Sequence, residues 1–563
     1  MKKLMIFFLS VVMVLPAFAG GRSAGTGASG GTSRIGEKGS IPLAANKPVL
    51  TMFIPGMYAD NLTSVDYRDN AFTKKIVDET GIQLQVTSTP GADAMERLNL
   101  MLNTGDYPDI IFSYYWDIDF DYYGRQGIFI PLDENELRTF PYIKRALDVY
   151  PAAMDKMVGT DGNIYGLPYI DVCNHCVQAN GRTWYYMPWI RDNNRKVPET
   201  AAEFTEYLRF VKNNDLNGNG RRDEVGLAFS SGALPNVISF FAKSFMPYVG
   251  GYALDSSRRI IEEHRDDRFR AALAYMAELY KEDLIVEDSF SMTGEQLQAL
   301  ARQNDPTVAV LGDTWLNGVI LYGTERLTDY FQLLPMKTAG GQRYGINNDP
   351  WSSIGVRYFI TDKCKDPELA IALYDYFQRD DVLKSAYGPK GVFWDDPDPG
   401  ALGADGKSAY WKWLVSFGVE PLNSHWGNGS PHVWLPEMRL GIQANDVDTA
   451  IKYLTTGDKS LKAAVQANPS YEATILWEYT AGEAKKIAIP DELFVPPAVM
   501  STADNTRIGD IEAVLNPYKN QAWVEFITGV RDINNNAQWN AYLADLDRLG
   551  SKELVSIRQK YVK

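Results

Sequence analysis

The sequence predicts an α/β fold in which parallel strands alternate with crossover helices, and three neighbouring segments carry this prediction. The run PVLTMFI, residues 48–54, is apolar and β-branched, as buried strands are. Residues 72–77 then place apolar side chains at helical spacing, and this pattern ends at Gly81, a residue suited to a helix C-terminus. Residues 82–86 are apolar at every second position, which indicates the next strand. A strand–helix–strand order of this kind requires parallel pairing.

A second unit repeats this plan over residues 94–112. AMERLNLMLNT places apolar residues along one helix face, a Gly-Asp pair stops the helix, and Ile110-Ile111-Phe112 has the composition of a buried strand. In parallel α/β sheets, ligands bind beyond the carboxyl ends of the strands. The loop SYYWDIDFDYY that follows Phe112 is therefore a candidate binding edge.

The later elements are predicted to be mostly helices. Thr200 and Glu203 have the spacing of a capping box, and they open a predicted helix that leads into an acidic loop. Residues 268–285 and 366–383 have the periodicity of amphipathic helices. TVAVLGDTW, from Thr307, begins as a short buried strand, and the carboxyl-terminal part is predicted to be mainly helical.

Length, composition and charge exclude some classes of function. The chain has 563 residues, of which 45% are hydrophobic and 23% charged, so it can bury a large core and form more than one domain. Its formal net charge is −15, and it has no long block of lysine and arginine. A nucleic-acid-binding protein would be expected to carry a basic surface, so this class is excluded.

Residues 1–19 have the three parts of a secretory signal peptide. Lysines precede an apolar run, and Ala17-Phe18-Ala19 offers a small-residue cleavage site. An uncleaved membrane anchor is disfavoured, because the apolar run is shorter than the ~20 residues of a spanning helix and contains Pro16. Residues 20–45 are rich in glycine and serine, which predicts a flexible tether. We therefore expect an exported protein, located in the periplasm or at the cell surface.

The three cysteines suggest neither a zinc site nor a redox centre. Cys173 and Cys176 have dithiol spacing, but the flanking sequence lacks the pattern of a thioredoxin-like unit, and nearby residues supply no further zinc ligands. In an exported protein, a local disulfide or two free thiols in a loop is favoured. Cys364 is then the cysteine left over from this pair, and it is expected to be buried.

The stretch DLNGNGRRDE, from Asp215 to Glu224, has the ligand spacing of a calcium loop. An EF-hand loop places oxygen ligands at positions 1, 3, 5, 7, 9 and 12, with glycine at position 6. Position 12 is Gly226 here, so Glu224 would take the place of the usual bidentate glutamate. The alternative is an Asn-Gly turn whose carboxylates face water, but the ligand-type residues at every odd position favour structural Ca²⁺. The candidate ligands are Asp215, Asn217, Asn219, Arg221 through its carbonyl, Asp223 and Glu224.

Seven segments together resemble the extracellular solute-binding proteins of bacterial ABC importers, the family 1 type that binds sugars and oligosaccharides. They are FTKKIVDETGIQLQV, LNLMLNTGDYPDII, GRQGIFIPLDE, DGNIYGLPY, VPETAAEFTEYLRFVKNNDLNGNGRRDEVGLAF, AVLGDTW and YGPKGVFWD, and they are spread over nearly all of the mature chain. Alginate-oligosaccharide-binding members of this family carry a calcium loop of the same form. The resemblance therefore implies that the loop of Asp215 holds calcium structurally, with no catalytic role.

The resemblance implies a periplasmic-binding-protein fold of two α/β lobes, joined by crossing strands, with the ligand in the cleft between them. Lobe 1 is expected to comprise residues 46–170 and 333–390, and lobe 2, which carries the acidic loop, residues 171–332 and 391–563. The crossings are expected near residues 168–172 and 331–335. Many relatives are lipoproteins with cysteine at the cleavage site, but no cysteine precedes Cys173, so lipid anchoring is not supported.

The candidate ligand-binding residues are mainly aromatic side chains at junctions between strands and loops. Sugar rings stack on aromatic faces, while their hydroxyl groups bond to carboxylates, amides and arginine. Trp116 and Asp117 follow the Ile110–Phe112 strand, and Trp315 follows the strand that starts near Thr307, at a position that contacts ligand in sugar-binding relatives. The full set is Trp315, Trp116, Asp117, Trp351, Trp394, Tyr58 and Arg182.

These features predict a monomeric, non-enzymatic substrate-binding component of an ABC transporter. It would capture an oligosaccharide by hinge closure and deliver it to the membrane permease subunits. A peptide-binding protein of the same fold is the main alternative, because main-chain groups hold peptides and leave little trace in a sequence. An exported carbohydrate-active enzyme is the other, but no recognised catalytic constellation is present in the sequence. Turnover of an oligosaccharide would identify the enzyme, and peptide binding would identify the first alternative.

Overall fold

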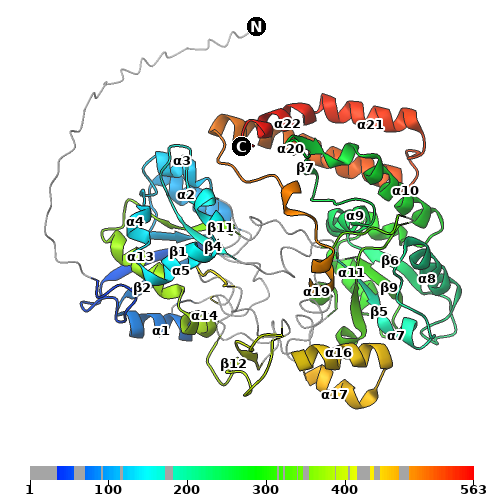
Figure 1. The fold of residues 1–563 in the computed structure, drawn as a ribbon, viewed down its shortest axis with the longest axis horizontal. Coiled ribbons are helices and arrows are strands. Elements are labelled where there is room, and N and C mark those ends of the chain that lie inside the picture. The colour runs from blue at the N-terminus through cyan, green and yellow to red at the C-terminus, as the bar shows by residue number, and fades with distance from the viewer. Residues whose placement is uncertain are drawn as a thin grey trace, which may run out of the picture.

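The computed structural model of this protein has two lobes, each built around its own β-sheet (Figure 1). The structure describes residues 35–55, 67, 70–89, 93–113, 118–170, 182–312, 316–320, 324–338, 340–345, 354–386, 388–403, 406–414, 426, 431–435, 444–467 and 481–562.

The first lobe contains a mixed five-stranded sheet in the order β2-β1-β3-β11-β4. Its strands are β1 (Val49–Pro55), β2 (Gln83–Thr89), β3 (Ile110–Phe112), β4 (Leu167–Ile170) and β11 (Ile354–Ile360). Strand β1 pairs in parallel with β2 and β3, as the sequence predicts, whereas β11 runs antiparallel to β3 and β4.

The two predicted crossover helices of this lobe are present. They are α1 (Ala71–Thr80), which the Asn70 side chain caps by accepting the N–H of Phe72, and α2 (Ala94–Thr104). Both helices end at a glycine in the left-handed conformation, where other residues would be strained. The other helices are α3 (Phe120–Arg125), α4 (Glu134–Leu137), α5 (Pro141–Val149), α6 (Ala152–Met157), α13 (Pro367–Phe377) and α14 (Asp380–Ala386).

The second lobe contains a four-stranded sheet in the order β10-β5-β9-β6. Its strands are β5 (Thr183–Tyr186), β6 (Val225–Phe229), β9 (Val308–Gly312) and β10 (Tyr330–Leu333). The predicted buried strand is β9, every residue of which is buried. Strand β5 runs antiparallel to both of its neighbours, while β6 and β9 are parallel.

The helices of the second lobe include the one predicted to lead into the acidic loop. They are α7 (Met187–Arg191), α8 (Ala201–Asn213), α9 (Leu234–Lys243), α10 (Asp267–Lys281), α11 (Gly294–Ala301) and α12 (Leu316–Val319). The capping box at the start of α8 is confirmed, because Thr200 and Glu203 bond to each other's backbone N–H groups. This part of the chain also contains the hairpin of β7 (Tyr252–Leu254) and β8 (Ile260–Glu262). Its described 3₁₀ helices are η3 (Ser231–Ala233), η4 (Glu263–Arg265), η5 (Glu287–Phe290) and η6 (Glu325–Asp329).

The carboxyl-terminal part is mainly helical, as predicted. Its elements are α16 (Ala444–Thr456), α17 (Lys459–Ala467), α19 (Ala481–Lys486), η9 (Asp491–Leu493), α20 (Thr502–Ile527), α21 (Asn536–Arg548) and α22 (Ser551–Gln559). Buried side chains of α20, α21 and α22, among them Phe526, Tyr542 and Leu554, join the core of the second lobe. Figure 1 shows these three helices along one side of that lobe.

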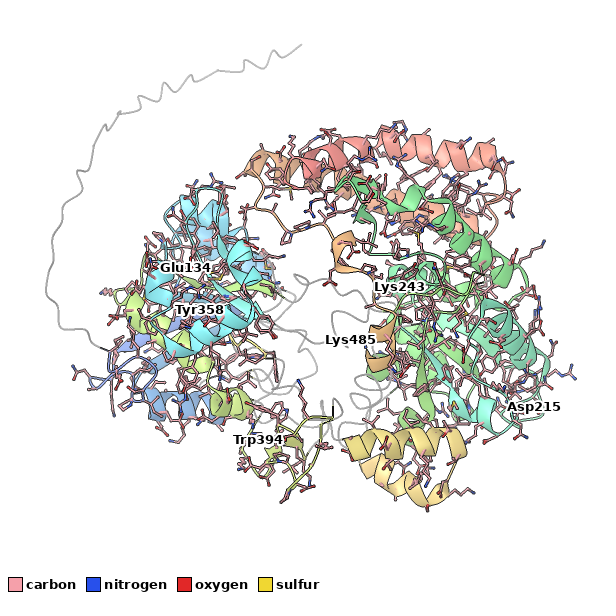
Figure 2. All side chains as sticks on the ribbon, in the orientation of Figure 1. Glu134, Asp215, Lys243, Tyr358, Trp394 and Lys485 are labelled. Carbon is pink, nitrogen blue, oxygen red and sulfur yellow. The ribbon has the colours of Figure 1, made fainter. Side chains whose placement is uncertain are left out.

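The buried apolar side chains form two large cores, one in each lobe. The first core contains Phe53, Ile111 and Tyr358, and Figure 2 shows Tyr358 within the first lobe. The second contains Trp184 and Leu311. Two separate cores let each lobe act as a stable unit, so relative motion of the lobes is physically available.

The chain passes between the two lobes more than once. It leaves the first sheet at Ile170 and enters the second at Thr183, then leaves the second sheet at Leu333 and returns to the first at Ile354. A third passage, which the predicted division placed at residues 390–391, lies later in the chain and connects the first core at Leu435 with α16, whose Ala450 lies in the second core.

The packing of residues 393–435 departs from the predicted division of the chain. The sequence assigned everything from residue 391 onward to lobe 2, but Phe393, Trp426 and Trp434 lie in the first core. The ring of Trp426 stacks on Phe377 of α13 at 5.7 Å between centroids, and its indole N–H donates to Thr73 of α1. Trp394 of the short strand β12 (Trp394–Asp395), which pairs with β13 (Lys412–Trp413), also lies in the first core.

In the part of the chain that the structure describes, helices that are both long and apolar enough for a membrane span are absent.

Candidate functional site

The acidic loop lies between the end of α8 and the start of β6, and Figure 2 places Asp215 at the edge of the second lobe that is farthest from the first. The Asp215 carboxylate accepts hydrogen bonds from backbone N–H groups of the loop that follows it. Its Oδ1 accepts the N–H of Gly218 and its Oδ2 accepts the N–H of Gly220, each at 2.8 Å. Both glycines have positive φ values, 75° and 82°, which side chains with a Cβ rarely adopt. The glycines are therefore required for this turn.

The two asparagines and Asp223 form the next layer of the loop. The Asn217 and Asn219 side-chain oxygens accept the backbone N–H groups two residues ahead, at 3.0 and 2.8 Å. Their amide nitrogens donate to Asp223 at 3.3 and 3.1 Å, and Arg221 pairs with the same carboxylate at 2.9 Å. Desolvation raises the pKa of Asp223, but the hydrogen bonds from the asparagines and the charge of Arg221 outweigh it and lower the pKa below its usual value.

Glu224 is the buried member of the loop, with 4% of its surface exposed. Its Oε1 accepts the N–H groups of Leu216 and Asn217 at 2.5 and 2.8 Å. Its Oε2 is buried and finds no hydrogen-bond partner among the described residues. A buried carboxylate oxygen without a partner is costly, and a cation in the loop would satisfy it.

The described carboxylate, histidine and cysteine side chains do not converge in groups of three that could hold a metal ion. In the acidic loop the carboxylates instead bond to backbone N–H groups and to asparagine. Any ion held there would depend on amide and carbonyl oxygens as well as on carboxylates, which is the ordinary donor set for Ca²⁺.

Most of the predicted ligand-binding residues lie outside the described residues. This holds for Tyr58, Trp116, Asp117, Trp315 and Trp351. The strands that lead to two of these positions are described: β3 ends at Phe112 and β9 at Gly312, and both strands are buried throughout. Cys173 and Cys176, predicted to form a local disulfide or to be two free thiols, also lie outside the described residues, while Cys364 is a buried free thiol, as expected.

Trp394 was predicted to contact ligand, but it is a core side chain. It is 6% exposed, its indole N–H donates to the carbonyl of Gly388 at 3.0 Å, and the ammonium group of Lys384 lies 5.4 Å from its ring centroid. A sugar needs an open aromatic face for stacking. The packing of Trp394 does not offer one, because the first core already covers the ring.

Arg182 lies at the start of β5 and is 1% exposed, next to a group of buried charges that the sequence did not reveal. Burial lowers the pKa of Lys243, at the end of α9, to about 7, with the nearby Glu263 opposing this shift and Arg182 adding to it. Burial likewise raises the pKa of Glu263 to about 7, against the N–H groups of Val249 and Gly251 that bond to its carboxylate. Figure 2 shows Lys243 on the side of the second lobe that faces the first.

Sequence comparison identifies the family of the chain. Residues 65–384 match the bacterial extracellular solute-binding proteins, so the chain belongs to that family. A similar curated protein is the fructooligosaccharide ABC transporter substrate-binding protein FusA of Streptococcus pneumoniae. It is 22% identical over 510 residues, which are 89% of this chain and 88% of FusA.

Solved structures establish the two-lobed α/β fold. FusA of S. pneumoniae in complex with kestose superposes with a TM-score of 0.65 at 20% identity, over 91% of this chain and 98% of FusA. An EF-hand mutant of FusA in complex with fructo-nystose gives the same TM-score of 0.65 at 19% identity and the same coverage, 91% and 98%. Alginate-binding protein AlgQ2 without calcium ion gives 0.60 at 19% identity, over 92% of this chain and 98% of AlgQ2. The fold predicted from the sequence is therefore confirmed.

Proposed function

We propose that the chain is the substrate-binding component of an ABC importer, which captures an oligosaccharide between its lobes and passes it to a membrane permease. The observation that carries this proposal is the pair of separately packed cores joined by the passages at residues 170–183 and 333–354. The fructooligosaccharide transport role of FusA supports an oligosaccharide as the ligand.

The mechanism is an equilibrium between open and closed arrangements of the lobes. A ligand that contacts both lobes binds the closed arrangement more tightly, so it shifts the population toward closure. We propose Trp116 and Asp117 as ligand contacts because they follow the buried strand β3 of the first lobe in the sequence, and Trp315 because it follows the buried strand β9 of the second. Trp351 and Tyr58 complete the proposed set. Arg182 was predicted to belong to it, but its side chain is as inaccessible as that of Trp394, with 1% of its surface exposed, so we leave it out. Binding and release need no covalent step, so the protein acts without catalysis.

Calcium in the acidic loop is the second part of the proposal, with Asp215, Asn217, Asn219, the Arg221 carbonyl, Asp223 and Glu224 as the residues that would hold it. The buried, unpaired Oε2 of Glu224 is the observation that fits a cation, and the FusA EF-hand mutant supports a loop of this kind in a relative. The ion would link the end of α8 to the start of β6. It would stabilise the second lobe and take no part in ligand chemistry.

Export completes the proposed function. Residues 1–19 would direct secretion and be removed, and residues 20–45 would tether the mature monomer outside the cytoplasmic membrane.

The test is isothermal titration of the mature chain with fructooligosaccharides, other neutral and acidic oligosaccharides, and short peptides, with chromatography of each sugar afterwards. We expect saturable binding of an oligosaccharide that is recovered intact. Release of shorter sugars would indicate an enzyme, and binding of peptides alone would indicate the alternative ligand class.

A further inference from the structure

A hollow on the second lobe is lined by four cationic side chains and two carboxylates. It has a volume of about 830 Å³ and lies between α7, the turn that follows it, the start of α8 and the end of α16. Figure 1 shows α7 and α16 side by side in the second lobe. Its charged lining residues are Arg191, Arg195, Lys196, Lys337, Glu199 and Glu203.

Both carboxylates of the hollow already have partners. Glu199 pairs with Lys337, with Oε2 and Nζ 2.7 Å apart. Glu203 belongs to the capping box of α8, where its Oε2 accepts the N–H groups of Glu199 and Thr200 at 2.9 and 3.0 Å. Of the three other cations, Arg191 pairs with Asp192, outside the lining, at 2.7 Å, and the charge of Lys196 contributes to the lowered pKa of Glu203. Arg195 is left without a carboxylate partner among the described residues.

Those cations carry hydrogen-bond donors that other described residues do not use. Arg191 bonds to Asp192 through Nε and Nη2, at 2.7 and 3.2 Å, but its Nη1 is buried without a hydrogen-bond partner in the described part of the chain. The guanidinium of Arg195 lies 3.6 Å from the centroid of the Phe210 ring. This stacking fixes the guanidinium plane and leaves its edge available as a donor. The adjacent Lys196 adds a further ammonium group to the lining.

This arrangement suits a small oxyanion. A planar guanidinium presents two parallel N–H donors to a phosphate, sulfate or carboxylate group, and an ammonium adds a point charge. The concave shape concentrates positive potential, and it does so on a chain whose formal net charge is −15. We propose that this hollow is an oxyanion-binding site, with Arg195 and Lys196 as its principal donors and Arg191 at its base. The residues that line it are not among the proposed oligosaccharide contacts.

The test is isothermal titration of the full mature chain with sodium phosphate and sodium sulfate, at constant ionic strength maintained with chloride. We expect one phosphate or sulfate to bind per chain, with affinity about tenfold weaker in Arg195→Ala and in Lys196→Ala. Arg195→Lys keeps the charge but loses the bidentate fork, so it should fall between these variants and the wild type. Parallel titration with glucose 6-phosphate distinguishes a free anion from an anionic sugar as the natural occupant.

The matched control is Lys281→Ala, which removes an exposed lysine of α10 outside the hollow. Oligosaccharide binding and circular dichroism of each variant report whether it is folded. Equal phosphate affinity in Arg195→Ala, Lys196→Ala and Lys281→Ala would overturn the proposal, as would the absence of phosphate or sulfate binding to the wild type. Either result would leave the proposed oligosaccharide function untouched.

Discussion

Replacing Glu224 by glutamine separates a calcium loop from a simple turn, because the two possibilities predict opposite effects on stability. The substitution preserves the side-chain volume and can keep the acceptor for the Leu216 and Asn217 N–H groups. It removes the negative charge and the unpaired Oε2. If the loop binds calcium, the substitution removes a metal ligand and should lower the stability of the protein. If the loop binds no calcium, the substitution removes a buried and poorly paired charge and should leave the stability unchanged or raise it.

The expected magnitude follows from ligand linkage. An ion present at 100 times its dissociation constant stabilises the folded state by about 2.7 kcal/mol. Loss of one anionic ligand that weakens affinity on the order of 100-fold would leave about 0.4 kcal/mol of this. Glu224→Gln should then cost about 2.3 kcal/mol in calcium, which corresponds to roughly 2 to 5 °C in the unfolding midpoint of a lobe of this size. In chelator, the variant should be as stable as the wild type or slightly more stable.

The assay is thermal unfolding of wild type and variant in 1 mM calcium chloride and in an excess of EGTA. Glu278→Gln, an exposed residue of α10, is the matched control and should behave as wild type in both buffers. If EGTA leaves the wild-type midpoint unchanged and Glu224→Gln is as stable as the wild type or more stable in both buffers, the loop is an Asn-Gly turn and the calcium proposal is wrong.

Three further predictions concern pH, packing and ligand contact. Folding raises the pKa of Glu263 from 4.5 to about 7, so the free energy of unfolding should decrease by at most about 3 kcal/mol as the pH rises from 4.5 to 7. In denaturant unfolding, the Glu263→Gln variant should not show this decrease, because its side chain does not titrate. Phe526→Ala should cost about 3–5 kcal/mol in the same assay, because this buried ring packs against Trp539 and Tyr542, and a smaller cost would show that α20 and α21 pack loosely. Trp315→Ala should weaken oligosaccharide affinity about tenfold or more in calorimetry with an unchanged unfolding midpoint, whereas unaltered affinity would remove this residue from the proposed contacts.

Local patterns in the sequence predicted local structure well. The order from β1 to β3 followed from periodicities of two and 3.6 residues, and the capping box of α8 followed from the spacing of Thr200 and Glu203. These features depend on residues that are close together in the chain, so they can be predicted without knowledge of the tertiary structure.

The features that the sequence did not reveal depend on distant partners. Strand β11 inserts antiparallel between β3 and β4, and described side chains such as Phe393, Trp426 and Trp434 belong to the first core, where Trp426 stacks on Phe377. Trp394 was predicted as a ligand contact because it is an aromatic residue at a junction between strand and loop, but it is buried in the first core, where it contacts Lys384 and Gly388. Tryptophan is common both in cores and in sugar sites, so composition alone does not separate the two roles.

The central claim is that an intact oligosaccharide closes the lobes. Small-angle X-ray scattering of the mature chain, with and without a saturating fructooligosaccharide, tests it most directly when the sugar is recovered and chromatographed afterwards. We predict a smaller radius of gyration in the presence of the sugar and complete recovery of the sugar unchanged. An unchanged radius in a sample shown by calorimetry to be saturated, or the appearance of shorter sugars, would contradict it.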